Sequence, residues 1–296
     1  MIKFNKNGII ISNEDCIKFA KKIEKETVAL IITSPPYCMQ KKYEDLKADL
    51  KTFRSNNKKI LKESIRVLKR GGSLCWQVGY HVKNGVVVPL DILVYNIIEE
   101  LNKTLDEDCK LFLRNRIIWT FGHGLHSENR FSGRHETILW FTKGKDYSFN
   151  LDCVRIPQKY PGKTFYKGKK KGEISGNPLG KNPSDVWDIP NVKNKHVEKT
   201  NHPCQFPEAL AQRLVLALSN KDDIVYDPFS GSGTTALACY LNERRFLGTE
   251  LDKEYFAISV NRLNSAFEGN VKIREDKPVI PPDPNSKVAK KPDNFI

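Results

Sequence analysis

Apolar residues along the chain form short continuous runs that alternate with stretches of helical period. Runs of strand length occupy residues 8–12, 27–32, 73–78, 116–119, 137–141, 223–226 and 245–249. Apolar residues recur with helical spacing in residues 15–23, 58–69, 89–101, 207–218, 234–241 and 254–267. The run at 27–32 is apolar after Thr27, which is typical of a strand buried on both faces. This alternation predicts an α/β fold with a mostly parallel, doubly wound sheet and helices on both faces.

Three segments lack this pattern. Residues 43–57 are polar, and we expect them to be mobile. Residues 143–199 are rich in Lys, Gly, Pro and Asn with few aliphatic residues, which indicates an inserted lobe with a poor core of its own. Prolines recur after Asp276, so this tail is expected to be extended or disordered. The chain therefore divides into 1–142, 143–199, 200–270 and 271–296, and the first and third parts are halves of one domain.

The composition suggests a polyanionic partner. The chain has 296 residues and 39% hydrophobic content, enough for one large α/β domain or for one domain with an inserted lobe. A formal net charge of +14 favours nucleic acid ahead of an anionic membrane, and a merely basic protein is the alternative. No apolar run approaches the ~20 residues that span a bilayer, and the first residues lack the apolar core of a signal peptide. We therefore expect a cytoplasmic protein that has no membrane partner.

The cysteines and histidines do not suggest a metal. Seven cysteines are scattered along the chain, and none forms a C-x-x-C pair. The six histidines have no metal-ligand spacing. The sequence predicts reduced thiols and no metal site.

A glycine-rich turn follows the strand predicted at 223–226. It reads Asp227-Pro228-Phe229-Ser230-Gly231-Ser232-Gly233-Thr234-Thr235 and leads into a helix. Strand, turn and helix in this order bind ligands in doubly wound sheets. The turn lacks the lysine of a phosphate-binding loop, and Ala236 replaces the third glycine of a dinucleotide site. An ordinary tight turn is the alternative.

Two acidic residues favour a particular ligand for this turn. A carboxylate at Asp227 would repel a pyrophosphate, but it suits a ligand that carries an ammonium and a sulfonium. Glu250 ends the next predicted strand, where a carboxylate can accept hydrogen bonds from both ribose hydroxyls.

A second candidate site follows the buried run at 27–32, in Ser34-Pro35-Pro36-Tyr37. This segment after a buried strand resembles motif IV of the amino-methyltransferases, which act on an exocyclic amine of a base. Such an amine is a poor nucleophile because its lone pair is delocalised into the ring. The Ser34 hydroxyl and the Pro35 carbonyl, which the prolines hold in place, can accept hydrogen bonds from the amine and free that lone pair. Tyr37 can stack on a base rotated out of a duplex and can hold a methyl sulfonium against its ring. Taken alone, the segment is also explained as a turn that ends a strand.

Together the two segments resemble those of the S-adenosylmethionine-dependent DNA amino-methyltransferases. Their order resembles the circularly permuted, beta-type subgroup, and the resemblance extends over most of the chain. It implies a Rossmann-like methyltransferase fold in which residues 1–142 are the catalytic half and 200–270 the cofactor-binding half. Residues 143–199 would be an inserted target-recognition region. The resemblance also implies S-adenosyl-L-methionine as cofactor and direct methyl transfer without a covalent intermediate.

The resemblance assigns roles to individual residues. The catalytic residues would be Ser34, Pro35, Pro36 and Tyr37. The cofactor-binding residues would be Asp227, Pro228, Phe229, Gly231, Ser232, Gly233, Thr234, Glu250, Asp15 and Phe206. Asp15 would accept from the adenine amino group, although a helix N-cap explains it equally. His135 and Glu136 would border the base pocket, and they either orient pocket residues or form a surface salt bridge.

One further motif could be misread. Pro203-Cys204-Gln205 matches the nucleophile motif of cytosine C5 methyltransferases, which attack the ring with a thiolate. The longer segment 202–210 instead resembles motif X of the amino-methyltransferases, which flanks the cofactor. Cys204 is therefore expected to be a buried packing thiol.

A lysine cluster is the candidate contact with DNA. It comprises Lys163, Lys167, Lys169, Lys170 and Lys171. Tyr160, Phe165 and Tyr166 lie among these lysines, and such a mixture suits phosphate contact and base stacking. A solvated lysine run is the alternative.

The position of Ser34 favours one target base. In this family Ser-Pro-Pro-Tyr is associated mostly with methylation of cytosine N4. We therefore expect a site-specific methyltransferase of double-stranded DNA, monomer or homodimer, with a cognate restriction endonuclease as a candidate partner. An adenine-N6 enzyme on the same scaffold is the first alternative, and methylation of RNA or protein another. A non-catalytic DNA-binding protein with this fold is a further alternative, and a nicotinamide oxidoreductase is disfavoured.

Overall fold

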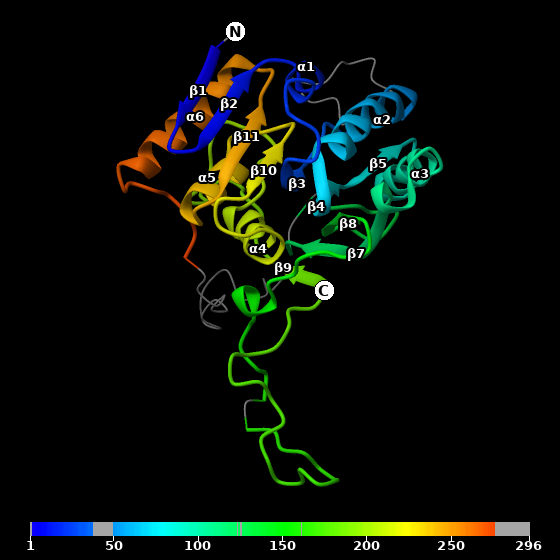
Figure 1. Cartoon of the computed structure of the whole chain (residues 1–296), viewed down its shortest axis with the longest axis vertical. Helices are drawn as coiled ribbons and strands as arrows, with labels where there is room; N and C mark the ends of the chain where they lie inside the picture. Colours follow the sequence, from blue (N-terminus) through cyan, green and yellow to red (C-terminus); the bar gives the residue numbers. More distant parts are fainter. Residues whose placement is uncertain (1, 38–49, 123, 125, 161, 276–296) are drawn as a thin grey trace, which may run out of the picture.

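A nine-stranded sheet forms the centre of the molecule (Figure 1). The computed structural model describes residues 2–37, 50–122, 124, 126–160 and 162–275. The strands of the sheet are β1 (Ile2–Lys6), β2 (Ile9–Asn13), β3 (Val28–Thr33), β4 (Leu68–Val78), β7 (Leu111–Thr120), β8 (His135–Lys143), β9 (Val186–Asp188), β10 (Ile224–Asp227) and β11 (Arg245–Thr249). Their order in space is β1-β2-β11-β10-β3-β4-β8-β7-β9.

The sheet is mostly parallel. Neighbouring strands from β2 through β11, β10 and β3 to β4 run in the same direction. β8 is antiparallel to both β4 and β7, β9 is parallel to β7, and β1 is antiparallel to β2 at the edge. A separate hairpin joins β5 (Tyr80–Lys83) to β6 (Val86–Pro89).

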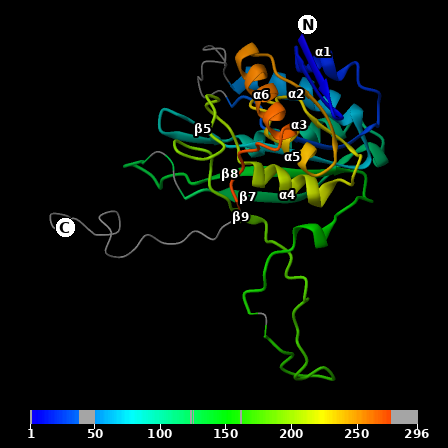
Figure 2. The same ribbon diagram turned by 90° about the vertical axis from the view of Figure 1, so that its left-hand side faces the viewer.

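Helices cover both faces of the sheet. They are α1 (Cys16–Ala20), α2 (Leu50–Val67), α3 (Leu90–Asn102), α4 (Glu208–Leu218), α5 (Thr234–Leu241) and α6 (Lys253–Phe267), with short 3-10 turns η1 (Glu107–Cys109) and η2 (Leu151–Val154). α1, α2 and α3 pack on one face of the sheet, and α4, α5 and α6 pack on the other (Figures 1 and 2). This arrangement confirms the predicted doubly wound α/β class.

The strand β3 shows why its sequence is apolar from Val28 to Ile32. Ile31 points to the face covered by α1, α2 and α3, whereas Leu30 and Ile32 point to the face covered by α4, α5 and α6. All three side chains are 2% exposed or less. Burial of each such side chain contributes roughly 1.5–3 kcal/mol, so a strand covered on both faces needs aliphatic residues throughout.

The helix α2 begins earlier than the sequence predicts. Residues 50–57, which were expected to be polar and mobile, form its first two turns, because Phe53 and Asn57 turn towards the core. Asn57 Nδ2 donates to Phe53 O, and Trp76 Nε1 on β4 donates to Asn57 Oδ1. A pattern of hydrophobic residues does not indicate that an asparagine is buried and bonds to a buried tryptophan. Residues 43–49 lie outside the described residues, as does the tail from residue 276 onwards.

The helix predicted at 58–69 also ends two residues earlier in the structure than its pattern indicates. The helix ends at Val67, and β4 already starts at Leu68, so Gly71 and Gly72 lie inside the strand. A Cβ at Gly72 would lie 2.8 Å from Lys69 O and 2.9 Å from Ala29 O, so only glycine allows this close approach of two strands.

The segment between β8 and α4 is divided between core and solvent. Trp187 and Ile189, in and after β9, are buried in the core together with Val154 of η2. Residues 155–181, without residue 161, form a two-stranded excursion that projects from the body of the molecule (Figures 1 and 2), and we call it the arm. In the part of the chain that the structure describes, no helix is long and apolar enough to cross a membrane.

Candidate active site

The two segments singled out in the sequence meet at one edge of the sheet. β3, β10 and β11 are parallel neighbours, so the turns at their carboxyl ends lie side by side. They border a cavity of about 660 Å³. Of the residues predicted for the site, those that line this cavity are Asp15, Ser34, Pro35, Pro36, Tyr37, Phe206, Pro228, Phe229, Gly231, Ser232, Thr234 and Glu250.

Asp227 lies behind the cavity wall. Its carboxylate is 1% exposed, and it accepts hydrogen bonds from the hydroxyls of Thr33 (2.7 Å) and Thr235 (2.8 Å) and from the backbone N–H of Phe229 (3.0 Å). Burial raises the pKa of Asp227 to about 6, and these three donors oppose the shift. The carboxylate therefore joins the residue before Ser34 to both sides of the glycine turn.

The glycine turn needs a backbone that side chains rarely adopt. Gly231 has a φ of 51° and Gly233 a φ of 75°, and Gly233 is the N-cap of α5. A Cβ at Gly233 would also lie 2.8 Å from the Cβ of Ser259 on α6. Gly233 therefore shapes the turn from behind, while Gly231, Ser232 and Thr234 face the cavity.

Glu250 holds the turn from the neighbouring strand. Its Oε2 accepts from Gly231 N at 2.8 Å, and its Oε1 accepts from Asp252 N at 2.8 Å. Burial raises the pKa of Glu250 to about 7, although both backbone donors favour the ionised form. A carboxylate fixed in this way on the cavity wall retains lone pairs for hydroxyl groups of a ligand.

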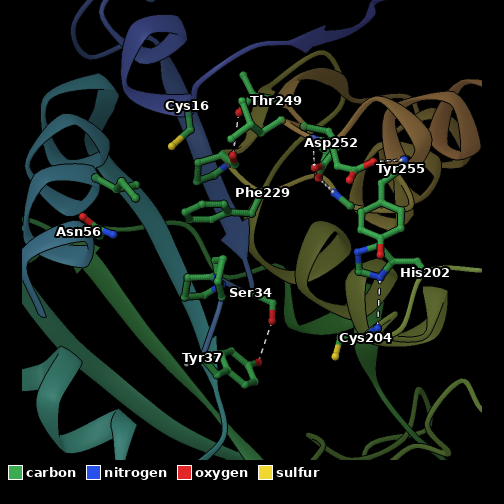
Figure 3. A pocket seen from close by; sticks show the side chains of 18 of the residues that line it. Cys16, Ser34, Tyr37, Asn56, His202, Cys204, Phe229, Thr249, Asp252 and Tyr255 are labelled. Carbon is green, nitrogen blue, oxygen red and sulfur yellow. Dashed lines mark hydrogen bonds between the residues drawn. The ribbon is translucent and has the colours of Figure 1, made fainter. Parts of the chain in front are cut away.

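Asp15 is an N-cap and also faces the cavity. Its Oδ1 accepts from the backbone N–H groups of Ile17 (3.1 Å) and Lys18 (2.9 Å) at the start of α1. Because one oxygen takes both capping bonds, the other is left for a ligand. Phe229 lies in the middle of the cavity wall, between this end and Ser34 (Figure 3).

The catalytic loop carries a chain of hydrogen bonds. Ser34 Oγ and Tyr37 Oη lie 2.7 Å apart (Figure 3). Tyr37 Oη donates to Glu136 Oε2 at 3.4 Å, and Gln77 Nε2 also donates to this oxygen. Glu136 therefore contacts a pocket residue, and among the described residues it forms no ion pair. Gln77 was missed, and the only signal was a polar residue at the end of an apolar strand.

The segment before α4 places His202 and Phe206 on the cavity wall. The His202 and Tyr255 rings meet edge to face, with centroids 4.5 Å apart (Figure 3). Burial lowers the pKa of His202 to about 4, so the ring is neutral near pH 7. Tyr255, in the first turn of α6, carried no signal in the sequence.

The prediction that Cys204 is a buried thiol is wrong, because its side chain is exposed. Gln205 is buried in its place. It accepts a hydrogen bond from the Thr200 hydroxyl and donates one to Glu198 O. A side chain that bonds at both ends competes better for this buried position than a thiol does.

The lysine cluster lies apart from the cavity. Its five members are exposed on the arm, and Lys163 lines a second, shallower hollow there. Among the described residues, no group of three or more His, Cys, Asp and Glu side chains could hold a metal ion.

Comparison with protein families gives one match over most of the chain. The sequence model N6_N4_Mtase, described as "DNA methylase", matches residues 28–261. The chain is 45% identical over 261 residues to the type II methyltransferase M.BglII of Bacillus subtilis, in an alignment that covers 88% of this chain and 70% of the relative. It is 32% identical over 272 residues to the DNA adenine methyltransferase YhdJ of Escherichia coli K12, covering 89% and 85%.

Two solved structures resemble the fold. The PvuII DNA methyltransferase (cytosine-N4-specific) superimposes with a TM-score of 0.66 at 21% identity, covering 85% of both chains. The putative DNA modification methylase TTHA0409 of Thermus thermophilus, complexed with S-adenosyl-L-methionine, superimposes with a TM-score of 0.60 at 25% identity, covering 87% of this chain and 93% of the other.

Proposed function

The chain belongs to the N6/N4 DNA methylase family, and from this premise we propose that it methylates cytosine N4 in a short sequence of double-stranded DNA. At the coarser level, it is a DNA methyltransferase that uses S-adenosyl-L-methionine and acts on an exocyclic amine. The observation that supports methyl transfer to a base amine is the meeting of Ser34-Pro35-Pro36-Tyr37 and the glycine turn on one cavity, and the serine at position 34 supports the choice of cytosine.

The cavity fits the cofactor. Glu250 would accept hydrogen bonds from ribose hydroxyls, Asp15 would accept from the adenine amino group, and the Phe229 ring would pack against the adenosine. Gly231, Ser232 and Thr234 would contact the amino-acid part. Asp227 does not line the cavity, so we assign it the role of holding the turn and not of binding the ligand directly. When bound, S-adenosyl-L-methionine supplies an electrophilic methyl group.

The catalytic loop prepares the amine of the base. Ser34 Oγ and the Pro35 carbonyl would accept hydrogen bonds from the two amine hydrogens, which draws the nitrogen lone pair out of the ring system. Tyr37 would stack on the base after it has been rotated out of the duplex. To do so, its hydroxyl must leave Ser34, which it contacts in the structure.

Serine at position 34 favours cytosine over adenine. The cytosine-N4-specific PvuII enzyme shares the fold, which agrees with this choice, whereas the similarity to YhdJ, named for adenine, keeps adenine N6 as the alternative. The two amines have similar geometry, so the serine hydroxyl forms no steric barrier against adenine. The choice of cytosine rests on the association of Ser-Pro-Pro-Tyr with cytosine N4 in this family.

The other parts of the proposal concern DNA. We assign residues 1–142 and 200–270 to the catalytic and cofactor-binding halves, and 143–199 to target recognition. The arm lysines are exposed and neighbour the exposed rings of Tyr160 and Tyr166, so they would contact phosphates. Since M.BglII is a type II methyltransferase, we also propose that this chain protects DNA against a cognate restriction endonuclease.

The experiment uses cofactor with a labelled methyl group and mixed-sequence duplex DNA, followed by digestion to nucleosides. We expect label in N4-methylcytosine. Label in N6-methyladenine would overturn the choice of base, and absence of label would contradict methyl transfer to DNA. Single-stranded DNA and RNA competitors should not reduce the labelling of the duplex.

The DNA contact has its own test. Replacement of Lys169, Lys170 and Lys171 by Gln should lower the slope of log affinity against log salt by about one for each phosphate that the variant no longer binds. Lys103→Gln, in an exposed lysine at the end of α3, is the control. An unchanged slope in the triple variant would exclude the arm from the phosphate contact.

A further inference from the structure

The acidic side chain of Glu136 reaches the catalytic loop from β8, which lies on the opposite side of β4 from β3. Because β8 is antiparallel to β4, its first residues lie at the same sheet edge as the carboxyl ends of β3 and β4. Glu136 is the second residue of β8, and Gln77 is the last residue but one of β4. Ser34 and Tyr37 follow β3. Four polar side chains from three strands therefore gather beside the cavity.

The two oxygens of Glu136 differ in their contacts. Oε2 accepts hydrogen bonds from both Tyr37 Oη and Gln77 Nε2. Oε1 accepts no hydrogen bond from the described residues, and it lies near Gly79, which has no side chain of its own. Gln77 Oε1 is buried without a partner among the residues that the structure describes. Buried polar atoms without partners are uncommon and require an explanation.

The surroundings of Glu136 shift its equilibrium towards the neutral, protonated form. Burial raises its pKa to about 7, against the two donated hydrogen bonds. Tyr37 is the titratable group that contacts Glu136. Gln77, which donates to Glu136, and Trp119, which pairs with it on β7, carry no charge. A protonated Glu136 would carry its proton on Oε1, since Oε2 already accepts two hydrogen bonds. The free oxygen of the acid is therefore a hydrogen-bond donor.

The Tyr37 hydroxyl lies between Ser34 Oγ and Glu136 Oε2 and bonds to both. A base whose amine contacts Ser34 would displace this hydroxyl. In cytosine and in adenine, the amine is separated by one ring carbon from a ring nitrogen that accepts hydrogen bonds. With the amine at Ser34, this nitrogen would lie on the side of Glu136.

We propose that Glu136 is a specificity-determining residue that donates a hydrogen bond to the ring nitrogen beside the methylated amine. That atom is N3 in cytosine and N1 in adenine. Thymine and guanine carry a hydrogen on the corresponding nitrogen, so the acid proton would face another donor. Gln77 acts through Glu136 and is a positioning residue. This inference rests on the proposed function, because it requires a base amine at Ser34.

The test combines protein variants with a modified base. Single-turnover methyl transfer is measured for the wild type, Glu136→Ala and Glu136→Gln on two duplexes. One duplex carries the natural target base, and the other carries its deaza analogue, 3-deazacytosine or 1-deazaadenine, in which the ring nitrogen is C–H. The wild-type rate on the natural duplex tests the proposed function independently of Glu136.

We expect the rate effects of the Glu136 variant and of the modified base to be non-additive. For the wild type, the rate of methyl transfer should fall about tenfold or more on the deaza base. For Glu136→Ala, the rate on the natural base should fall by a similar factor. Replacement of the natural base by the deaza base should then lower the rate of this variant by less than about threefold. Glu136→Gln, whose amide still donates, should remain sensitive to the deaza change. Glu107→Ala, which removes an exposed carboxylate, should behave like the wild type.

Two results would contradict the inference. An equal loss on the deaza base in the wild type and in Glu136→Ala would mean that Glu136 does not contact the ring nitrogen, even if the enzyme methylates DNA. Failure of the wild type to methylate the natural base would overturn the proposed function and the inference with it. Cofactor binding and thermal melting of Glu136→Ala separate loss of the hydrogen bond from loss of the fold, and Glu136→Gln repeats the test with the shape retained.

Discussion

The two ends of the cavity differ in how their polar groups are satisfied. At the cofactor end, Asp227 and Glu250 each accept two or more hydrogen bonds from the glycine turn and its neighbours. At the base end, Ser34, Tyr37 and Glu136 bond in a chain, while Gln77 Oε1 has no partner among the described residues. Because buried polar groups without partners are costly, the two carboxylates of the cofactor end are preformed, whereas the base end requires its substrate to complete it.

The strongest way to separate the two ends is Ser34→Ala. Loss of the hydroxyl should slow single-turnover methyl transfer by about 10²–10³-fold, because the amine then lacks an acceptor in the transition state. Cofactor affinity, measured by calorimetry, should stay within about twofold. If cofactor binding weakens as much as transfer does, the two ends are not independent.

The matching change at the cofactor end is Asp227→Ala. Two buried hydroxyls, on Thr33 and Thr235, would lose their acceptor, so we expect the free energy of unfolding to fall by about 2–4 kcal/mol. Cofactor affinity should fall as well, because the turn is no longer held. Asp146→Ala, in an exposed residue after β8, is the control for denaturant unfolding. Equal unfolding midpoints for the two variants would contradict the role of Asp227.

Glu250 gives a smaller effect that depends on pH. Glu250→Gln should weaken cofactor binding by about tenfold, because the amide nitrogen cannot accept from a ribose hydroxyl. Ribose hydroxyls favour the ionised form of Glu250, whose pKa near 7 is raised by burial. Affinity of the wild type should therefore fall as pH decreases from 8 to 6. Titrations at both pH values would contradict this account if the two proteins showed the same pH dependence.

The smallest expected effect concerns stability at the base end. The pKa of Glu136 is raised by burial from 4.5 to about 7, so the folded protein binds its proton more tightly than the unfolded chain does. The stability that this group contributes is present below pH 4.5 and is lost as pH rises through 7. Glu136→Gln cannot ionise. Its melting temperature relative to the wild type should therefore be higher by a few degrees at pH 8 than at pH 5. A constant difference would exclude this titration.

The turns that border the cavity could be located from the sequence, because their chemistry is local. Gly231 and Gly233 stand where the backbone is left-handed, and Ser34-Pro35-Pro36 follows the buried strand β3 directly. Contacts between distant segments could not be predicted in this way. The hydroxyl that holds Asp227 belongs to Thr33, 194 residues away, so the sequence placed this carboxylate towards the ligand when the structure buries it.

The same limit applies at the base end. Glu136 was expected to border the pocket, but its bond to Tyr37 joins residues 99 apart, and nothing local distinguishes it from a surface ion pair. The early start of α2 and the exposure of Cys204 have the same origin. In each case a hydrogen bond made by Asn57 or by a neighbour of Cys204 decides what the hydrophobic pattern leaves open.

The most direct test of the central claim is the nucleoside composition of DNA from a host that lacks amino-methylation of its own and expresses this chain. Mass spectrometry of digested DNA should detect N4-methylcytosine with the wild type and none above background with Ser34→Ala. N6-methyladenine in its place would contradict the assignment of cytosine to Ser34. Equal methylation by the wild type and Ser34→Ala would contradict the catalytic site itself.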